Sequence, residues 1–313
     1  MKKFMMLILC VALVIGSFAG CSAKTEAASE SANAEEQQKE EAGDKKVERD
    51  PNKKAILVVS FGTSYADTRK VTIEACEEKI TKAFPEYDVR RAFTSQIIIE
   101  KLKERDNILV ENPTEALTKL KDEGFSEVYI QPLHVINGAE YDDIVAETSE
   151  FQEDFDKLVL GRPLLTSVDD YRKVAEALAE QMPERSEKEA VVFMGHGTHH
   201  DANAAYACLD YIFEDEGQNN VFVGTVEGFP DLDTVIKRLE KNNIEKVTLM
   251  PLMLVAGDHA QNDMAGDEED SWKVILKGKG YEVETVLRGL GEVSKIQDIY
   301  IEHLKTAMSG ESH

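Results

Sequence analysis

Residues 190–198, AVVFMGHGT, contain the pattern that indicates the fold of this 313-residue chain. An apolar run of strand length leads directly into a histidine between two glycines, which is typical of a buried strand ending in a functional loop. Two later apolar runs repeat the arrangement and deliver Glu227 and His259 to strand ends. Because the carboxyl ends of parallel strands meet at one edge of an α/β sheet, we expect His196, Glu227 and His259 to converge.

Two imidazoles and one carboxylate are a ligand set for a borderline divalent metal, with positions left open for a substrate. We therefore expect His196, Glu227 and His259 to bind Co²⁺, Fe²⁺, Ni²⁺ or Zn²⁺, which ligand type alone does not rank. His196 is also the expected catalytic proton acceptor, since an unperturbed imidazole titrates at about 6.5. A rival metal cluster of His196 with His199 and His200 stays open, although these two histidines also suit a place in the cleft or at a helix cap.

Apolar runs of strand length alternate with amphipathic helical segments, which is typical of a parallel sheet covered by helices on both faces. In the first half the expected elements are a strand at 55–60, a helix at 68–83, a strand at 87–93, helices at 95–105 and 114–123, and a strand at 127–133. In the second half they are strands at 190–194, 221–226 and 246–252, separated by helices at 202–214 and 232–242.

The two halves of the folded part resemble each other. Residues 59–63 (VSFGT) match 194–198 (MGHGT), and 131–140 (QPLHVINGAE) match 250–259 (MPLMLVAGDH) without a gap. Phe61 then occupies the place of His196, and Glu140 that of His259. We expect an α/β fold of two similar domains, each a parallel sheet flanked by helices, with a cleft between them and the metal ligands on the second.

The N-terminal region predicts export and lipid anchoring. Residues 1–20 have the basic start and short apolar core of a signal peptide, and they end before Cys21 in a sequence similar to a bacterial lipobox. Acylation of Cys21 would attach the chain to the membrane outside the cytoplasm. Residues 21–53 have too few apolar side chains to order themselves and predict a tether, followed by lobes at 54–185 and 186–313.

Charge and composition exclude several classes of partner. The chain has a formal net charge of −24, which argues against a nucleic-acid partner because phosphate binding requires basic surface. The loop at His196 lacks the lysine and spacing of a phosphate-binding loop, so no nucleotide is expected. Cys76 and Cys208 are expected to be small buried thiols, and the sequence leaves a homo-oligomeric state open.

Several long motifs in one order resemble the class II tetrapyrrole chelatases, specifically the anaerobic cobalt chelatases of the CbiK type. These motifs are 57–64 (LVVSFGTS), 91–95 (RAFTS), 133–138 (LHVING), 195–197 (GHG), 204–210 (AAYACLD) and 251–259 (PLMLVAGDH). The resemblance implies a lyase that inserts Co²⁺ into sirohydrochlorin without ATP, on the early-cobalt route to cobalamin. It also implies that His196, Glu227 and His259 hold the metal.

Substrate contacts are expected from the first lobe. The candidates are Ser60, Phe61, Gly62, Thr63, Arg91 and Glu140. A guanidinium such as that of Arg91 binds carboxylates bidentately, and sirohydrochlorin carries many carboxylates. Glu140 fits either a contact with the ring or a helix cap. Two alternatives stay open: an exported metal- or haem-binding lipoprotein that serves as a transport receptor or carrier, and a ferrochelatase or nickel chelatase of the same fold.

Overall fold

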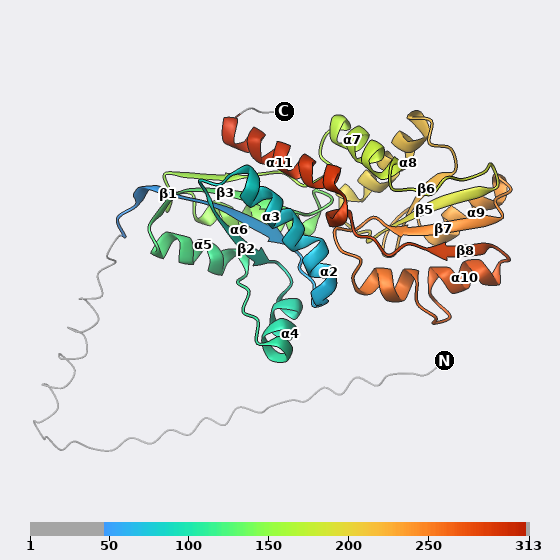
Figure 1. Cartoon of the computed structure of the whole chain (residues 1–313), viewed down its shortest axis with the longest axis horizontal. Helices are drawn as coiled ribbons and strands as arrows, with labels where there is room; N and C mark the ends of the chain where they lie inside the picture. Colours follow the sequence, from blue (N-terminus) through green and yellow to red (C-terminus); the bar gives the residue numbers. More distant parts are fainter. Residues whose placement is uncertain (1–46, 311–313) are drawn as a thin grey trace, which may run out of the picture. The chain divides into compact units, whose positions relative to one another are not determined.

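Two four-stranded parallel sheets form the framework of the computed structural model, which describes residues 47–310 (Figure 1). The first sheet has the strand order β2-β1-β3-β4 and the second has the order β6-β5-β7-β8, so the same topology occurs twice. The predicted α/β fold with two similar parallel-sheet lobes is confirmed. The strands are β1 (Asp50–Ser60), β2 (Asp88–Phe93), β3 (Phe125–Pro132), β4 (Lys157–Leu160), β5 (Glu189–Gly195), β6 (Val221–Thr225), β7 (Lys246–Pro251) and β8 (Glu282–Thr285).

Helices connect the strands and cover both faces of each sheet (Figure 1). In the first lobe they are α2 (Ala66–Val71), α3 (Ile73–Ala83), α4 (Gln96–Asp106), α5 (Pro113–Asp122), α6 (Ala139–Glu150) and α7 (Val168–Ala179). In the second they are η1 (Asp201–Asn203), α8 (Ala204–Asp215), α9 (Leu232–Lys241), the π-helical turn η2 (Ala260–Met264), α10 (Trp272–Gly278), η3 (Leu290–Glu292) and α11 (Ser294–Ser309).

Alternation along the strands decides which helices cover each face. On one face of the first sheet, Leu57 and Val59 pack with α5 and α6; on the other, Ile56 and Val58 pack with α3 and α11. The second sheet is covered in the same way, by α9 and α10 on one face and by α7 and α8 on the other. One apolar cluster includes the inner faces of both sheets, so the lobes share a core.

The last helix of each half packs against the other half. Helix α7 ends the first half and packs on α8, whereas α11 ends the chain and packs on α3, α7, β3 and β4 (Figure 1). The Tyr300 hydroxyl donates to the Leu133 carbonyl at 2.9 Å, and His303 lies 3.0 Å from the buried carboxylate of Asp170. Apolar burial and these polar contacts therefore hold α11 against the first lobe.

Two features of the first lobe differ from the expectations, and in the second lobe Cys208 is exposed although a buried thiol was expected. Strand β1 begins at Asp50, inside the predicted tether, because the backbone N–H of Asp50 donates to Gly124 at 2.9 Å and extends the pairing with β3. Its first four residues are exposed, so they lack the apolar signal of a strand. The helix predicted over 68–83 is interrupted at Thr72, whose hydroxyl donates back to the Thr68 carbonyl.

The sequence pattern also missed the short edge strands β4 and β8, whose side chains are mostly partly or fully exposed. The apolar run in β4 is only three residues long, 158–160, and β8 has a single apolar residue, Val283. Helices α6, α7, α10 and α11 had no predicted counterparts. None of the helices within residues 47–310 is long and apolar enough to cross a bilayer. The predicted signal peptide, Cys21 and most of the predicted tether lie outside the described residues.

Candidate functional site

His196 stands at the carboxyl end of β5, in a loop whose backbone requires glycine. Gly197 has a φ of 84°, and a Cβ atom there would lie 2.5 Å from the backbone nitrogen of Gly228. The Nδ1 atom of His196 lies 2.8 Å from the Gly197 carbonyl oxygen. A carbonyl only accepts, so Nδ1 carries the proton and Nε2 keeps its lone pair. In this tautomer the exposed His196 ring has Nε2 available as the atom that would bind a metal.

Glu227 follows β6 and is tied to the same loop through its backbone. Its N–H donates to the His196 carbonyl at 2.8 Å, and the N–H of Val226 donates to the Gly195 carbonyl at 3.0 Å. The Glu227 side chain is exposed. The sheet therefore places the backbone of Glu227 next to that of His196, although 31 positions separate the two residues in the sequence.

His259 comes from the segment after β7 and meets His196. The two ring centroids are 4.6 Å apart, and the ring planes are nearly perpendicular at 87°. The Nδ1 atom of His259 lies 2.5 Å from a carboxylate oxygen of Asp263, one π-helical turn further along η2. Two of the three predicted ligands are thus in contact, as expected for side chains delivered by neighbouring strands of one sheet.

The described residues, 47–310, contain no group of three His, Cys, Asp or Glu side chains arranged to hold a metal ion. The structure brings together the imidazoles of His196 and His259, and it joins Glu227 to His196 through the backbone alone. In the predicted reaction the metal is a substrate that must also leave with the product. The ligand assignment for all three residues remains a prediction.

His200 has a structural role and His199 is exposed. The Nδ1 atom of His200 accepts a hydrogen bond from the Ala202 N–H at 3.1 Å, which caps η1, so the predicted capping role is confirmed for this residue. Its Nε2 atom lies 3.1 Å from the carboxylate of Asp142 on α6, in the first lobe. With both ring nitrogens occupied, His200 has no free nitrogen for a metal cluster with His196.

The loop after β1 adopts the backbone of the loop after β5. Gly62 has a φ of 92°, and Thr63 is buried with its hydroxyl accepting from the Tyr65 N–H at 3.2 Å. Phe61, at the place of His196, is 50% exposed and presents an apolar ring at the strand end. The buried Ser60 hydroxyl has no hydrogen-bond partner in the described part of the chain. Among the substrate-binding candidates, Phe61 is the side chain best placed to contact a ligand.

Contacts between strand-end loops join the two lobes. The Tyr65 hydroxyl lies 3.2 Å from the carboxylate of Asp258, and His200 meets Asp142 as described above. Glu140 lies at the start of α6, where its carboxylate accepts from the Thr94 hydroxyl at 2.7 Å beside the end of β2. The loops that carry Phe61 and Glu140 thus face the loops that carry the imidazole pair.

Arg91 is paired with carboxylates of its own lobe. Its guanidinium donates to both carboxylate oxygens of Glu77, at 2.7 Å from Nε, and lies 3.5 Å from Glu74. Arg91 pairs with Val58 inside the sheet, and its side chain extends toward α3. Two internal carboxylates thus bind the guanidinium, and its contact with substrate carboxylates stays a prediction.

Sequence reasoning missed four residues near these loops. Asp263, the partner of His259, is detectable as an acidic residue four positions after a histidine. Arg69 and Arg105 donate to the carbonyls of Thr63 and Ser64 and so brace the loop after β1. The ring nitrogens of His134 are buried without a partner among the described residues, and burial lowers its pKa to about 4, so His134 is neutral at neutral pH.

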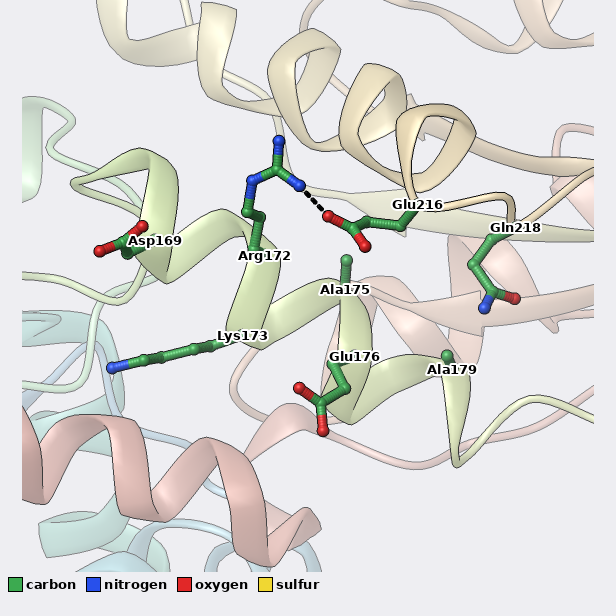
Figure 2. Close-up of a pocket in the computed structure, with 8 residues that line it drawn as sticks. All are labelled: Asp169, Arg172, Lys173, Ala175, Glu176, Ala179, Glu216 and Gln218. Atoms are coloured by element: carbon green, nitrogen blue, oxygen red, sulfur yellow. Dashed lines mark hydrogen bonds and ion pairs between the residues drawn. The ribbon is translucent and has the colours of Figure 1, made fainter.

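A cavity of about 320 Å³ lies elsewhere, between α7 and the end of α8 (Figure 2). Arg172, which lines this cavity, already forms ion pairs with Asp215 and Glu216. None of the predicted site residues lines it. The chemistry is therefore expected at the strand ends rather than in this cavity.

Comparison with known proteins found sequence relatives that align with most of the chain. The chain is 48% identical over 257 residues to the sirohydrochlorin cobaltochelatase of Salmonella typhimurium, covering 82% of this chain and 97% of the relative. It is 38% identical over 264 residues to the sirohydrochlorin cobaltochelatase CbiKC of Nitratidesulfovibrio vulgaris, covering 82% of this chain and 91% of that one.

The solved structure of SirB from Bacillus subtilis with Fe³⁺ has a similar fold, with a TM-score of 0.57 and 15% sequence identity over 83% of this chain and 98% of SirB. The family profile for cobalt chelatase (CbiK) matches residues 54–309, nearly all of the folded part. The predicted resemblance is confirmed, and the chain belongs to the CbiK family of cobalt chelatases.

Proposed function

We propose that this protein is a sirohydrochlorin cobaltochelatase, which exchanges the two pyrrole N–H protons of the ring for one Co²⁺ ion. The supporting observation is the contact between the imidazoles of His196 and His259. They follow separate strands, and their ring centroids are 4.6 Å apart. Imidazole nitrogens are suitable ligands for Co²⁺ and similar divalent ions.

His196 is the proposed ligand and proton acceptor, and Glu227 and His259 are the further metal ligands. Two pyrrole protons must leave as the ion passes from the protein to the ring. When the Nε2 atom of His196 releases the ion, its lone pair is free to accept one of these protons near neutral pH, and the second proton leaves to solvent. His196 is exposed at the strand end, where a ring could approach it. Phe61 is half-exposed at the matching position of the first lobe and offers an apolar surface to the tetrapyrrole.

Five alanine variants test the ligand assignment. His196→Ala, Glu227→Ala and His259→Ala should each lower kcat/KM for cobalt insertion by about 100-fold or more, with His196→Ala the most severe. His199→Ala and His200→Ala should cost less than about tenfold, because one side chain is exposed and the other caps a helix. Circular dichroism should show that all five are folded. Large losses in the last two variants, with Glu227 and His259 dispensable, would support the compact histidine cluster instead.

Turnover distinguishes a chelatase from a carrier. A metal- or haem-binding lipoprotein with the same ligands would bind its cargo stoichiometrically, whereas the proposed enzyme converts many equivalents of sirohydrochlorin without added nucleotide. Parallel assays with Co²⁺, Fe²⁺, Ni²⁺ and Zn²⁺ would rank the metals, which ligand type alone does not separate.

We further propose that the enzyme is exported and held at the membrane by an acylated Cys21. Support comes from the sequence, in which a basic start and an apolar run precede Ala19-Gly20-Cys21 and a polar segment follows. Mass spectrometry of the N-terminal peptide from native cells should show lipid on Cys21. An unmodified N-terminus at another residue would refute this assignment.

A further inference from the structure

Asp263 is the hydrogen-bond partner of His259. The carboxylate Oδ2 of Asp263 lies 2.5 Å from the imidazole Nδ1, and the two side chains are 42% and 33% exposed. The π-helical turn η2 sets this contact: it begins directly after His259, and the N–H of Ala265 donates to the Ala260 carbonyl at 3.2 Å. Such turns widen a helix locally and alter which side chains meet.

The contact determines which nitrogen of His259 can bind a metal. A carboxylate accepts a hydrogen bond, so Nδ1 is the protonated nitrogen and the lone pair is on Nε2. His196 has the same Nδ1–H tautomer, but there the acceptor is the Gly197 carbonyl. Both imidazoles thus offer Nε2, but His196 is oriented by backbone and His259 by a side chain.

We infer that Asp263 is a positioning residue for metal handling: it fixes the tautomer and ring orientation of His259 so that Nε2 meets the incoming ion. This inference rests on the proposed function, because it assumes that His259 is a ligand. Histidine ligands commonly donate their second ring N–H to a carboxylate, and loss of that partner typically costs 10- to 100-fold in metal affinity or activity.

Asp258 supplies a matched control. It lies five residues before Asp263 in the same segment, but its carboxylate meets the Tyr65 hydroxyl at 3.2 Å and the Asn262 amide at 3.0 Å. Neutralising either residue removes one negative charge near the imidazole pair. A long-range electrostatic effect on Co²⁺ would therefore appear in both variants, whereas loss of His259 orientation would appear only in the Asp263 variant.

The test compares full-length Asp263→Leu, Asp263→Glu and Asp258→Asn with wild type, using two measurements that need no turnover. Long-range ¹⁵N–¹H spectra of histidine-labelled protein at about pH 8, where free imidazole is neutral, report which ring nitrogen carries the proton. Titration with Co²⁺ alone, followed by its absorption spectrum, reports affinity. Circular dichroism checks that each variant is folded.

We expect Asp263→Leu to lose the fixed Nδ1–H tautomer of His259 and to bind Co²⁺ about 10- to 100-fold more weakly. Asp263→Glu should recover much of the affinity, and Asp258→Asn should stay within about threefold of wild type. In steady state, Asp263→Leu should raise the KM for Co²⁺ and leave the KM for sirohydrochlorin unchanged. An unchanged tautomer, or equal Co²⁺ affinities in the Asp263→Leu and Asp258→Asn variants, would overturn the inference. Absence of turnover in wild type, with the tautomer and affinity effects intact, would instead refute the proposed function.

Discussion

The chain turns through Phe61 and Gly62 after β1, and through His196 and Gly197 after β5. Both glycines have positive φ, of 92° and 84°, and both loops accept a hydrogen bond from the second residue after the neighbouring strand. In the first lobe Ser95 donates to the Phe61 carbonyl at 3.3 Å; in the second Glu227 donates to the His196 carbonyl at 2.8 Å. The backbone is thus the same while the side chains differ.

This comparison separates the scaffold from the chemistry. At matching positions the first lobe has a phenyl ring, a helix-capping serine and Glu140, whereas the second has His196, Glu227 and His259. An identical topology can therefore present an apolar and acidic surface on one side and a nitrogen-rich surface on the other. The fold positions the groups, and the ligand assignment proposed above places metal handling on the second lobe because of the identity of those groups.

The largest difference in catalytic rate between changes in the two lobes should follow substitution of the matched glycines, Gly197 and Gly62. In Gly197→Ala the new Cβ atom would lie 2.5 Å from the backbone nitrogen of Gly228, which cannot rotate away, so the His196 loop must shift. A shift of about 1 Å at a reacting group can cost about 100-fold in rate, and we expect at least that loss in kcat/KM. In Gly62→Ala the atom at 2.5 Å is on the Phe93 ring, a side chain.

We expect Gly62→Ala to lower the free energy of unfolding by about 1–3 kcal/mol, with less than a tenfold effect on kcat. Urea unfolding and cobalt insertion assays on both variants measure the two effects. Equal losses of kcat would show that the first-lobe loop takes part in the chemistry as directly as the second.

A smaller loss, in unfolding free energy, is expected when either of the two half-buried arginine–carboxylate pairs is broken. Each lobe has one such pair. Arg91 binds Glu77, and Arg238 binds both oxygens of Asp210 at 2.8 and 2.7 Å. Arg91→Ala and Arg238→Ala should each cost about 1–2 kcal/mol of unfolding free energy, because a partly buried carboxylate loses its partner.

Neither arginine variant should change the KM for sirohydrochlorin. Thermal unfolding and substrate titration measure the two quantities on the same samples. A raised KM in Arg91→Ala alone would restore its predicted contact with the substrate and would show that its pairing with Glu77 is broken when substrate binds.

The smallest loss of unfolding free energy should follow removal of either of the two side-chain contacts that join the lobes. Tyr65 follows Phe61 by four residues and His200 follows His196 by four, and each meets a carboxylate of the opposite lobe, on Asp258 and Asp142. The two carboxylates are exposed to solvent, so Tyr65→Phe and Asp142→Asn should each cost less than about 1 kcal/mol by urea unfolding. A larger loss in either variant would mean that this contact holds the lobes together.

Much of the fold could be predicted from the sequence because buried parallel strands leave continuous apolar runs, as in residues 190–194. Strand segments that lack a long apolar run could not be predicted. The exposed start of β1 at Asp50 has no apolar residue, and edge strands such as β8 are only partly buried. Composition therefore predicted a tether where the backbone pairs with β3.

The site could be predicted in part. Three strand ends carry His196, Glu227 and His259, and the parallel sheet brings two of them into contact. For Arg91 the sequence showed a basic residue near a strand end, but it could not show that its side chain extends toward Glu77 on α3. Partners supplied by another element are invisible to spacing, whereas the local partner Asp263 was accessible as an i,i+4 pair.

The position of α11 also constrains the order of events during synthesis. The first sheet is complete in sequence by Leu160, yet one of its faces is covered by Ile296, Ile299 and Tyr300, which are made only after the whole second sheet. Each such large apolar side chain contributes about 1.5–3 kcal/mol when buried. A nascent chain that has finished the first lobe thus still exposes apolar surface, and that half can reach its final stability only after residues 294–309 have left the ribosome.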